Sequence, residues 1–465
     1  MKEQTVAAEL KEKLMHKPTN GWKRLTPQQQ EEVMRFAEGY TDFLGKAKTE
    51  REAVILSVAM LEKANFRPFD PAASYQAGDR VYTVNRNKAI IAAVIGQQPL
   101  EQGVRIVAAH IDAPRLDLKQ HPLYEADELA YFKTHYYGGI RKYQWATVPL
   151  SLHGVVVRAD GASVTVNIGE DAGDPQFVIT DLLPHLSAEQ NKRTLADGIR
   201  GEELNVLIGS RPFNNDEEAE SVKLQVMNIL NEKYGITEAD FMSAELEIVP
   251  AAKPVDIGLD RSMIGAYAHD DRVCAYPALM ATLALDVPEK TVVTVLADKE
   301  ETGSDGNTGL NSSFLRYFVE DLAECMGAKG HRVLSASQCL SADVNGAFDP
   351  TFSDPYEKRN SCYLNYGAVL TKYTGGRGKY DTSDASAEFT GAIRNKMDEA
   401  GVIWQTGELG KVDAGGGGTV AKYIANLNVD VIDLGVPVLC MHAPFEVIAK
   451  LDLYMAYRAI QTFYC

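Results

Sequence analysis

The sequence predicts a mixed α/β fold in which a main domain is interrupted by a smaller, β-rich domain. Helix and strand signals alternate in the first and last parts of the chain, whereas the middle holds short β-like pieces and charged stretches. A chain of 465 residues is too long for one ordinary core, so two domains are expected, with three as the alternative. The predicted main domain spans 1–120 and 253–465, and the inserted domain spans 121–252.

The chain up to about residue 70 is predicted to be helical. Thr26 followed by Pro27 is typical of a helix start, and apolar residues then recur at helical spacing. The segment 51–64 continues the same pattern. Beyond it, residues 81–84 and 89–95 alternate or cluster as strands do, so the main sheet is expected to begin there.

The middle of the chain has a different texture. Residues 155–158 and 163–166 are short and β-like, and the segments 191–203 and 214–221 are rich in charge. Few residues here suggest metal chemistry. After residue 252 the alternation of helix and strand resumes, which favours an insertion into one domain over a chain of consecutive domains.

The composition is that of a globular protein, with 45% hydrophobic and 24% charged residues and a net charge of −17. Such a balance argues against a nucleic-acid partner, which requires clustered Lys and Arg. It also argues against binding to an anionic membrane surface. A solvated acidic surface is the simplest explanation of the charge, so the charge does not identify a substrate.

The cysteines and the apolar stretches bear on the compartment. The six cysteines form no C-x-x-C pair, which is typical of free thiols in a reducing compartment. The charged N-terminal segment does not read as a secretion signal, and the apolar stretches are shorter than the roughly 20 residues that span a bilayer. We therefore expect a cytoplasmic protein.

Four apolar runs each lead into residues that bind metals. Because the carboxyl ends of strands in an open α/β sheet carry the chemistry, these residues are expected to converge on one edge of one sheet. Mixed imidazole and carboxylate ligands suit zinc, manganese or cobalt. The runs end at His110 with Asp112, at Glu300 with Glu301, at Asp343, and at His442.

Each candidate has a functional and a structural interpretation. Asp112 could fix the tautomer of a ligating His110, or the pair could be a core histidine beside a turn. Asp270 could bridge two metals, or it could cap the apolar helix that follows it. Glu300 and Glu301 repel each other when buried without a cation, and a surface acidic turn is the alternative. Their joint occurrence favours a hydrolytic metal centre.

The motifs in this order resemble the aspartyl aminopeptidase and aminopeptidase I family of co-catalytic zinc exopeptidases. The resemblance covers nearly the whole chain, and the family fold is a zinc-exopeptidase domain interrupted by a β-rich dimerisation domain. It is carried by A-H-I-D-A-P-R-L-D-L-K at 109–119, D-K-E-E-T-G-S at 298–304, S-A-D-V at 341–344 and D-L-G-V-P-V-L-C-M-H at 433–442.

The resemblance implies a role for each residue. It implies two divalent metal ions, most often zinc, with cobalt and manganese as alternatives. One ion would be held by His110 and Asp343 and the other by Glu301 and His442, with Asp270 bridging both. The implied general base is Glu300. Asp112 supports a ligand, and His185 in the inserted domain reaches a neighbouring subunit's active site.

The implied function is a metalloaminopeptidase that releases N-terminal residues from peptides. Lys372 and Tyr380 correspond most nearly to substrate-contacting residues of relatives, although their spacing differs by one residue. The family implies homo-oligomers built from dimers, commonly a dodecamer. A metal-dependent amidohydrolase acting on small N-acyl compounds, and a catalytically inactive oligomeric scaffold, remain as alternatives. Whether acidic or neutral N-terminal residues are preferred stays open.

Overall fold

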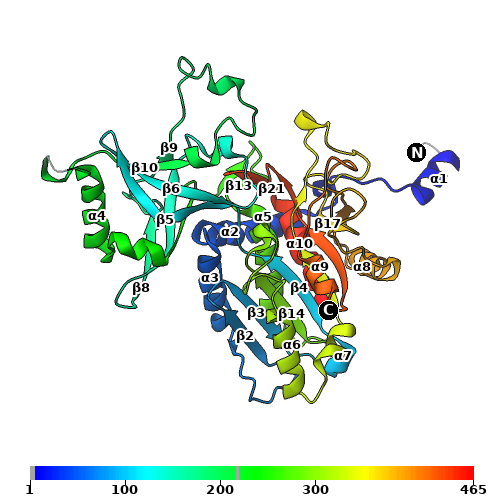
Figure 1. Cartoon of the computed structure of the whole chain (residues 1–465). Coiled ribbons are helices and arrows are strands. Elements are labelled where there is room, and N and C mark those ends of the chain that lie inside the picture. The colour runs from blue at the N-terminus through cyan, green and yellow to red at the C-terminus, as the bar shows by residue number, and fades with distance from the viewer. Residues whose placement is uncertain (1–5, 216–218) are drawn as a thin grey trace.

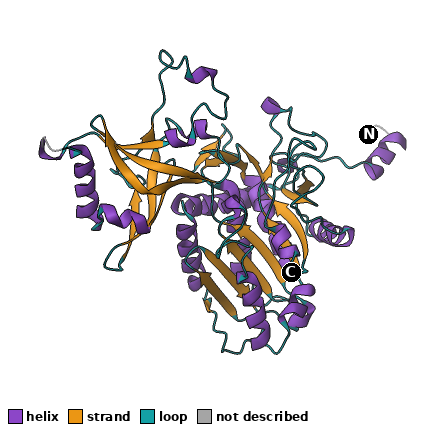
Figure 2. Cartoon of the chain, in the orientation of Figure 1, coloured by secondary structure: helices purple, strands orange, loops and turns teal. Residues whose placement is uncertain are grey.

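A computed structural model describes residues 6–215 and 219–465 of the chain. Residues 1–5 of the predicted helical segment and residues 216–218 of the charged stretch 214–221 lie outside the described part. The chain forms three sheets with helices around them (Figures 1 and 2). The mixed α/β class that the sequence predicts is confirmed.

The largest sheet has nine strands in the order β1-β2-β3-β14-β4-β15-β19-β17-β18 and mixes parallel and antiparallel pairs. Three of the four apolar runs predicted to be buried strands are its central strands β14, β4 and β15, and β14 is buried along its whole length. The strands are β1 (Arg67–Pro68), β2 (Arg80–Asn85), β3 (Ala89–Val94), β4 (Arg105–His110), β14 (Val292–Ala297), β15 (Gln338–Ala342), β17 (Ala368–Thr371), β18 (Trp404–Thr406) and β19 (Asp430–Gly435).

Helices cover both faces of this sheet. In β4, Val107 and Ala109 enter one core, and Ile106 and Ala108 enter the other, because successive strand residues face opposite ways. The first core is closed by α2 (Pro27–Lys46), α3 (Glu50–Lys63), α5 (His269–Leu283), α8 (Ala387–Glu399) and α10 (Lys450–Tyr464). The second is closed by α6 (Phe314–Cys325), α7 (Gly330–Ser335) and α9 (Ala421–Ala425).

The N-terminal helices begin where the sequence predicts. Thr26 caps α2, its hydroxyl accepting from the backbone N–H of Gln29, whose side chain accepts from the Thr26 N–H. Thr49 and Glu52 form the same reciprocal cap on α3. A further helix, α1 (Val6–Leu14), projects from the body of the molecule (Figure 1).

The middle of the chain forms an antiparallel sheet of seven strands, β8-β7-β11-β5-β6-β10-β9, with a core of its own around Trp145. It lies to one side of the nine-stranded sheet (Figure 1). It begins at Arg115, ahead of the predicted boundary at residue 121. Its elements are β5 (Arg115–Ala126), β6 (Leu129–Tyr137), β7 (Leu150–Val157), β8 (Ser163–Ile168), β9 (Val178–Ile179), β10 (Asn205–Gly209), α4 (Ser221–Tyr234) and β11 (Ala244–Pro250).

A third sheet of five short strands joins distant parts of the main domain. It carries His442 just after β20, so the expectation that all four apolar runs end in one sheet is wrong. At Gly435 the chain leaves β19 against the backbone of Asp343, and the next run pairs elsewhere. The strands are β12 (Val255–Ile257), β13 (Met263–Ala266), β16 (Asn345–Gly346), β20 (Pro437–Leu439) and β21 (Glu446–Ala449).

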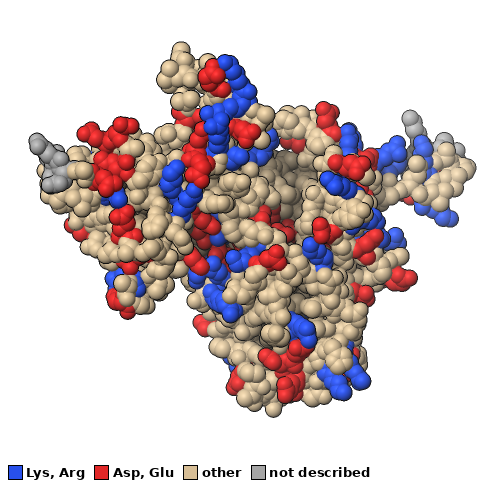
Figure 3. Space-filling model, viewed as in Figure 1, with Lys and Arg blue, Asp and Glu red and all other residues tan. Residues whose placement is uncertain are grey.

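Acidic and basic side chains are interspersed over the face shown in Figure 3. Within residues 6–215 and 219–465, no helix has the length and apolarity needed to cross a bilayer.

Candidate metal centre

Three neighbouring strands deliver candidate ligands to one edge of the nine-stranded sheet. His110 is the last residue of β4, and Asp343 follows β15. Glu300 and Glu301 begin a 3-10 helix, η8 (Glu300–Thr302), just after β14. Since β14 and β15 flank β4 and run parallel to it, their carboxyl ends meet at this edge.

Asp270 and His442 approach the same point from other elements. Asp270 lies in the first turn of α5, and His442 lies in the turn between β20 and β21. Asp270 stands between the two imidazoles. One of its carboxylate oxygens is 3.2 Å from Nε2 of His110, and the other is 3.1 Å from Nε2 of His442.

The remaining candidates complete two groups around Asp270. Nε2 of His110 is 3.7 Å from Asp343, and Nε2 of His442 is 3.4 Å from Glu301. His110, Asp270 and Asp343 therefore form one possible metal site, and Asp270, Glu301 and His442 form another. A third possible group joins His110 to Glu300 and Glu301, and Glu300 lies 3.8 Å from His110.

The electrostatics of the cluster are those of crowded negative charge. Burial raises the pKa of Glu300 to about 8, with the carboxylate of Asp343 adding to the effect and His110 opposing it. Burial also raises the pKa of Glu301 well above its usual range. Burial acts to lower the pKa of His442, but Asp270 and Glu301 outweigh it and raise that pKa to about 10.

Divalent cations fit this site. Nε2 of His110 and one carboxylate oxygen of Glu301 are buried without a hydrogen-bond partner. Four carboxylates and two imidazoles crowd together, which is costly unless cations compensate the negative charge. Imidazole nitrogen and carboxylate oxygen are zinc ligands, so the donor set agrees with the predicted metal.

Two buried carboxylates hold the ligands in place. Asp112 lies beside Nδ1 of His110 at 3.2 Å and accepts from the backbone N–H groups of Glu300 and Glu301. Glu446 accepts from the backbone N–H of Asp270 at 3.1 Å and from that of His442 at 2.6 Å. The sequence indicated Asp112 but gave no signal for Glu446, which follows no motif.

A cavity of about 560 Å³ opens onto the cluster. Its walls combine apolar side chains, a glycine-rich stretch and one ion pair, between Lys422 and Asp381 at 3.5 Å. Besides Glu300 and the four candidate ligands Asp270, Glu301, Asp343 and His442, the lining includes Gly139, Val344, Asn345, Thr374, Leu409, residues 416–419, Tyr423 and Met441. The four-glycine stretch at 415–418, which carries no phosphate-loop signature, thus contributes to the wall.

Three predicted site residues lie apart from both the cluster and this lining. Lys372 is paired with Asp384, and Tyr380 is 69% exposed. His185 lies exposed in the segment between β9 and β10, which rises at the top of Figure 1. The structure therefore brings together the five ligand candidates, Glu300 and Asp112, and leaves His185, Lys372 and Tyr380 apart from them.

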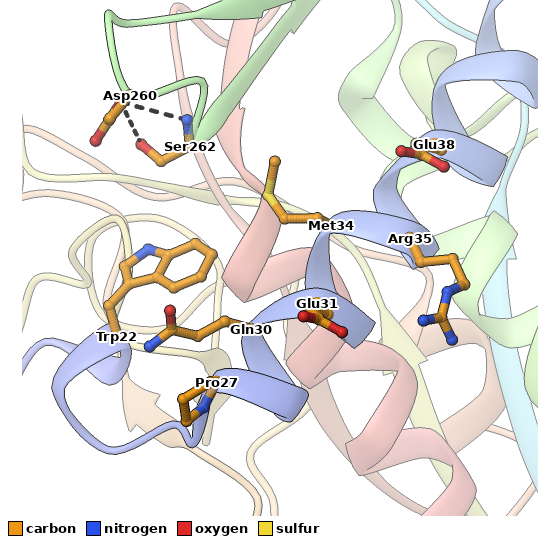
Figure 4. A pocket seen from close by; sticks show the side chains of 9 residues that line it. All are labelled: Trp22, Pro27, Gln30, Glu31, Met34, Arg35, Glu38, Asp260 and Ser262. Atoms are coloured by element: carbon orange, nitrogen blue, oxygen red, sulfur yellow. Dashed lines mark hydrogen bonds between the residues drawn. The ribbon is translucent and has the colours of Figure 1, made fainter.

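A larger cavity of about 740 Å³ lies away from the cluster (Figure 4). Trp22 faces α2 residues across it, and Asp260 accepts hydrogen bonds from Ser262 at its edge. None of the three possible metal groups found among the described residues includes a residue of its lining. Volume alone therefore does not locate the chemistry.

Comparison with known proteins decides the family. Residues 43–464 match the family described as aminopeptidase I zinc metalloprotease (M18). The chain belongs to the M18 family. A probable M18 family aminopeptidase 1 from Clostridium acetobutylicum is 47% identical over 449 residues, which cover 95% of this chain and 97% of that protein. One from Thermotoga maritima is 47% identical over 438 residues, covering 92% and 96%.

The fold of this M18 chain agrees with solved structures of the family. The crystal structure of the M18 aminopeptidase from Thermotoga maritima has a TM-score of 0.93 at 44% identity, covering 97% of this chain and 99% of that one. Aminopeptidase I from Clostridium acetobutylicum has a TM-score of 0.91 at 43% identity, covering 97% and 100%. The chain is therefore a zinc aminopeptidase, and the amidohydrolase and inactive-scaffold alternatives are set aside.

Proposed function

We propose that this M18 aminopeptidase binds two divalent cations, most often zinc. In this assignment His110 and Asp343 hold one ion, and Glu301 and His442 hold the other. Asp270 bridges them. The observation that carries the proposal is the position of Asp270, whose two oxygens each lie within 3.2 Å of a different imidazole.

Glu300 is the proposed general base. When bound, the two cations supply Lewis-acid polarisation of a water and of the scissile carbonyl. The Glu300 carboxylate then accepts a proton from the attacking water and delivers it to the leaving amine, a role worth roughly 10²–10⁴ in rate. Its backbone N–H is held by Asp112, so the side chain reaches into the cavity from a fixed position.

The proposed substrates are peptides with a free N-terminus. The cavity ends at the carboxylate-rich cluster, which offers partners for an α-ammonium group. A longer peptide would extend toward the open side of the cavity. Release of single N-terminal residues follows from this geometry, because a chain blocked at its amine lacks the group that the cluster recognises.

The decisive experiment compares Glu300→Gln with wild-type protein. The amide keeps the size of the side chain but cannot accept the proton, so turnover of an aminoacyl anilide is expected to fall by roughly 10²–10⁴. Zinc content, measured by metal analysis, should stay at two ions per chain. Glu31→Gln, in the cavity of Figure 4, is the matched control and should keep full activity. Substantial turnover by Glu300→Gln would refute the assignment.

We further propose a homo-oligomer built from dimers, in which His185 serves a neighbouring subunit's site. His185 lies among exposed apolar side chains, with Leu182 51%, Leu183 50% and Leu186 67% exposed. Such a loop is suited to burial against another copy. The structure titled S. cerevesiae mApe1 dodecamer is 20% identical with a TM-score of 0.74, and we propose a similar closed assembly for this chain.

The inserted domain, predicted from the sequence at residues 121–252 and beginning in the structure with β5 at Arg115, is proposed to serve pairing of subunits. A cytoplasmic location is proposed for the protein. Lys372 and Tyr380 are retained as substrate-contacting candidates only for a state in which the loop that carries them closes over the cavity.

A further inference from the structure

The inserted sheet ends at the metal cluster. Its strand β6 finishes at Tyr137, and the next two residues, Gly138 and Gly139, lie against the candidate ligands. Gly139 also lines the cavity. The two glycines thus bring backbone from the inserted sheet into a site otherwise formed by the main domain.

Tyr137 acts on the first histidine through Asp112. Its hydroxyl donates to one carboxylate oxygen of Asp112 at 2.8 Å. The other carboxylate oxygen of Asp112 and its backbone carbonyl face Nδ1 of His110, at 3.2 and 3.1 Å. Both are acceptors, so Nδ1 carries the proton and Nε2 keeps the lone pair that a cation would bind.

Gly139 acts on the second histidine directly. Its carbonyl oxygen accepts from Nδ1 of His442 at 2.9 Å, so the neutral ring has its lone pair on Nε2, which faces Asp270 and Glu301. A side chain at either glycine would crowd this approach. A Cβ added to Gly139 would lie 3.2 Å from Nδ1 of His442, and one added to Gly138, where φ is +74°, would lie 3.3 Å from Cβ of Glu301.

Tyr137 is itself held by charges from both domains. The guanidinium of Arg115 lies 4.0 Å from the centre of its ring. Arg115 in turn is bound by Glu50, the first residue of α3, at 3.2 Å and by Glu247 of β11 at 3.3 Å. The tyrosine is therefore fixed where the inserted sheet meets the main domain.

We propose that Tyr137, Gly138 and Gly139 form a positioning segment through which the inserted domain sets the tautomer and orientation of both histidine ligands. The inference rests on the proposed ligand assignment and adds to it. The inserted domain then does more than pair subunits. Metal affinity depends on how its sheet packs against α3, because that packing fixes Tyr137. Tyr137 acts through Asp112 and Gly139 acts through its carbonyl oxygen, so both are positioning residues.

The test measures the zinc dissociation constant by equilibrium competition with a chromophoric chelator, which does not depend on activity. Tyr137→Phe removes only the hydroxyl and keeps the ring on Arg115. We expect zinc binding to weaken by about 10- to 100-fold, the usual cost of losing a group that orients a ligand. The neighbouring exposed residue gives the matched control, Tyr136→Phe, which should bind zinc as wild type does.

Further variants separate positioning from folding. Asp112→Asn should weaken zinc binding, and adding Tyr137→Phe to it should change little, since the hydroxyl acts through Asp112. Additive losses would overturn that route. If Tyr137→Phe lowers the melting temperature of the metal-free protein, Gly139→Ala provides the second test. This variant is expected to weaken zinc binding at the His442 side. A zinc affinity equal to that of wild type would overturn the proposal.

The outcome also distinguishes this inference from the proposed function. Wild-type protein that fails to bind two zinc ions per chain would refute the ligand assignment itself. Wild-type protein that binds two ions, with Tyr137→Phe and Gly139→Ala binding them equally well, would leave the assignment intact and refute the positioning segment alone.

Discussion

At the scale of single residues, buried carboxylates that are not themselves proposed ligands hold the candidate ligands in position. Glu446 shows this most clearly, because its two oxygens accept from the backbone N–H groups of Asp270 and His442. Asp270 is the proposed bridging ligand, and His442 is a proposed ligand of the second ion. The carboxyl group of Glu446 is buried. Burial is the main cause that raises its pKa to about 8, and the nearby carboxylate of Asp270 adds to the effect. Such a group is retained at a cost in solvation, which a nearby cation offsets.

The first prediction concerns Glu446→Gln. The amide has one acceptor oxygen in place of two, so one backbone N–H is left without a partner in a buried site. We expect zinc affinity to fall by about 10- to 100-fold while the metal-free melting temperature changes little. Chelator competition measures the affinity, and calorimetry supplies the fold control. Unchanged affinity would show that the Glu446 charge does not orient the ligands.

The second prediction concerns pH. In the metal-free protein the pKa of Glu300 is about 8, against an ordinary value of 4.5, and that of His442 is about 10, against 6.5. Both folded-state values are raised, so the stability they supply is present at low pH and is lost as the pH rises through each folded pKa. We expect the melting temperature of metal-free protein to fall between about pH 6 and pH 9.

Zinc should flatten this dependence, because cations replace the protons that the ligands hold. The gain in melting temperature on adding zinc is therefore expected to be larger at about pH 9 than at about pH 6. Differential scanning calorimetry measures how the melting temperature changes with pH in the metal-free protein and in the protein reloaded with zinc. A metal-free protein that becomes more stable over this range would contradict the charge distribution described for the cluster.

At the scale of elements, the composition of the cavity wall predicts a preference for neutral N-terminal residues. Val344, Leu409 and Met441 contribute apolar surface from three separate segments. Among the described lining residues Lys422 is the one Lys or Arg, and Asp381 lies 3.5 Å from its ammonium group. An acidic side chain entering here would meet an apolar wall and a cation that already has a partner.

The third prediction follows from this wall. A leucyl substrate should show a kcat/KM at least about tenfold higher than an aspartyl substrate, since an unpaired carboxylate loses hydration in an apolar pocket. Asp381→Asn removes the carboxylate that pairs with Lys422. It should therefore raise kcat/KM for the aspartyl substrate and lower the leucyl-to-aspartyl ratio of kcat/KM. Initial rates with matched anilides measure both values, and Asp349→Asn, outside the cavity lining, is the control. A preference for the aspartyl substrate in wild-type protein would contradict the prediction.

At the scale of the whole molecule, completion of the active site by a second copy is the main proposal. His185 is exposed and outside the lining of its own chain's cavity. A cis role therefore requires a large rearrangement of the segment between β9 and β10, whereas a trans role requires only subunit pairing. The exposed leucines around it supply apolar area for such a contact.

The fourth prediction tests this arrangement by complementation. His185→Ala and Glu300→Gln chains should each be nearly inactive when assembled alone. Assembled together, a His185→Ala subunit keeps its own Glu300 and receives His185 from its Glu300→Gln neighbour, so part of the activity should return. Co-expression with different affinity tags isolates the mixed oligomer for rate measurements. Mixed oligomers that stay as inactive as their parents would place His185 in its own subunit's site or outside catalysis.

Much of the candidate site could be predicted from local sequence. His110, Glu300 and Asp343 each follow an apolar run, and the hydrogen-bond ladder of a parallel sheet brings the ends of such runs to one edge. The helix start at Thr26 was equally local, since a cap depends on residues three apart. These features depend on near neighbours in sequence and on periodicity, which the sequence displays directly.

The sequence by itself therefore determined the fold class, the hydrolytic metal chemistry and most of the residues that the cluster brings together. Only the tertiary structure decided that His442 follows a strand of the five-stranded sheet, that Glu446 accepts from the backbone of two ligands, and that Gly139, two residues beyond β6 of the inserted sheet, reaches His442. These contacts join residues up to 303 positions apart in the chain. The contacts of Glu446 with Asp270 and of Gly139 with His442 follow no local pattern, because they join segments 176 and 303 positions apart.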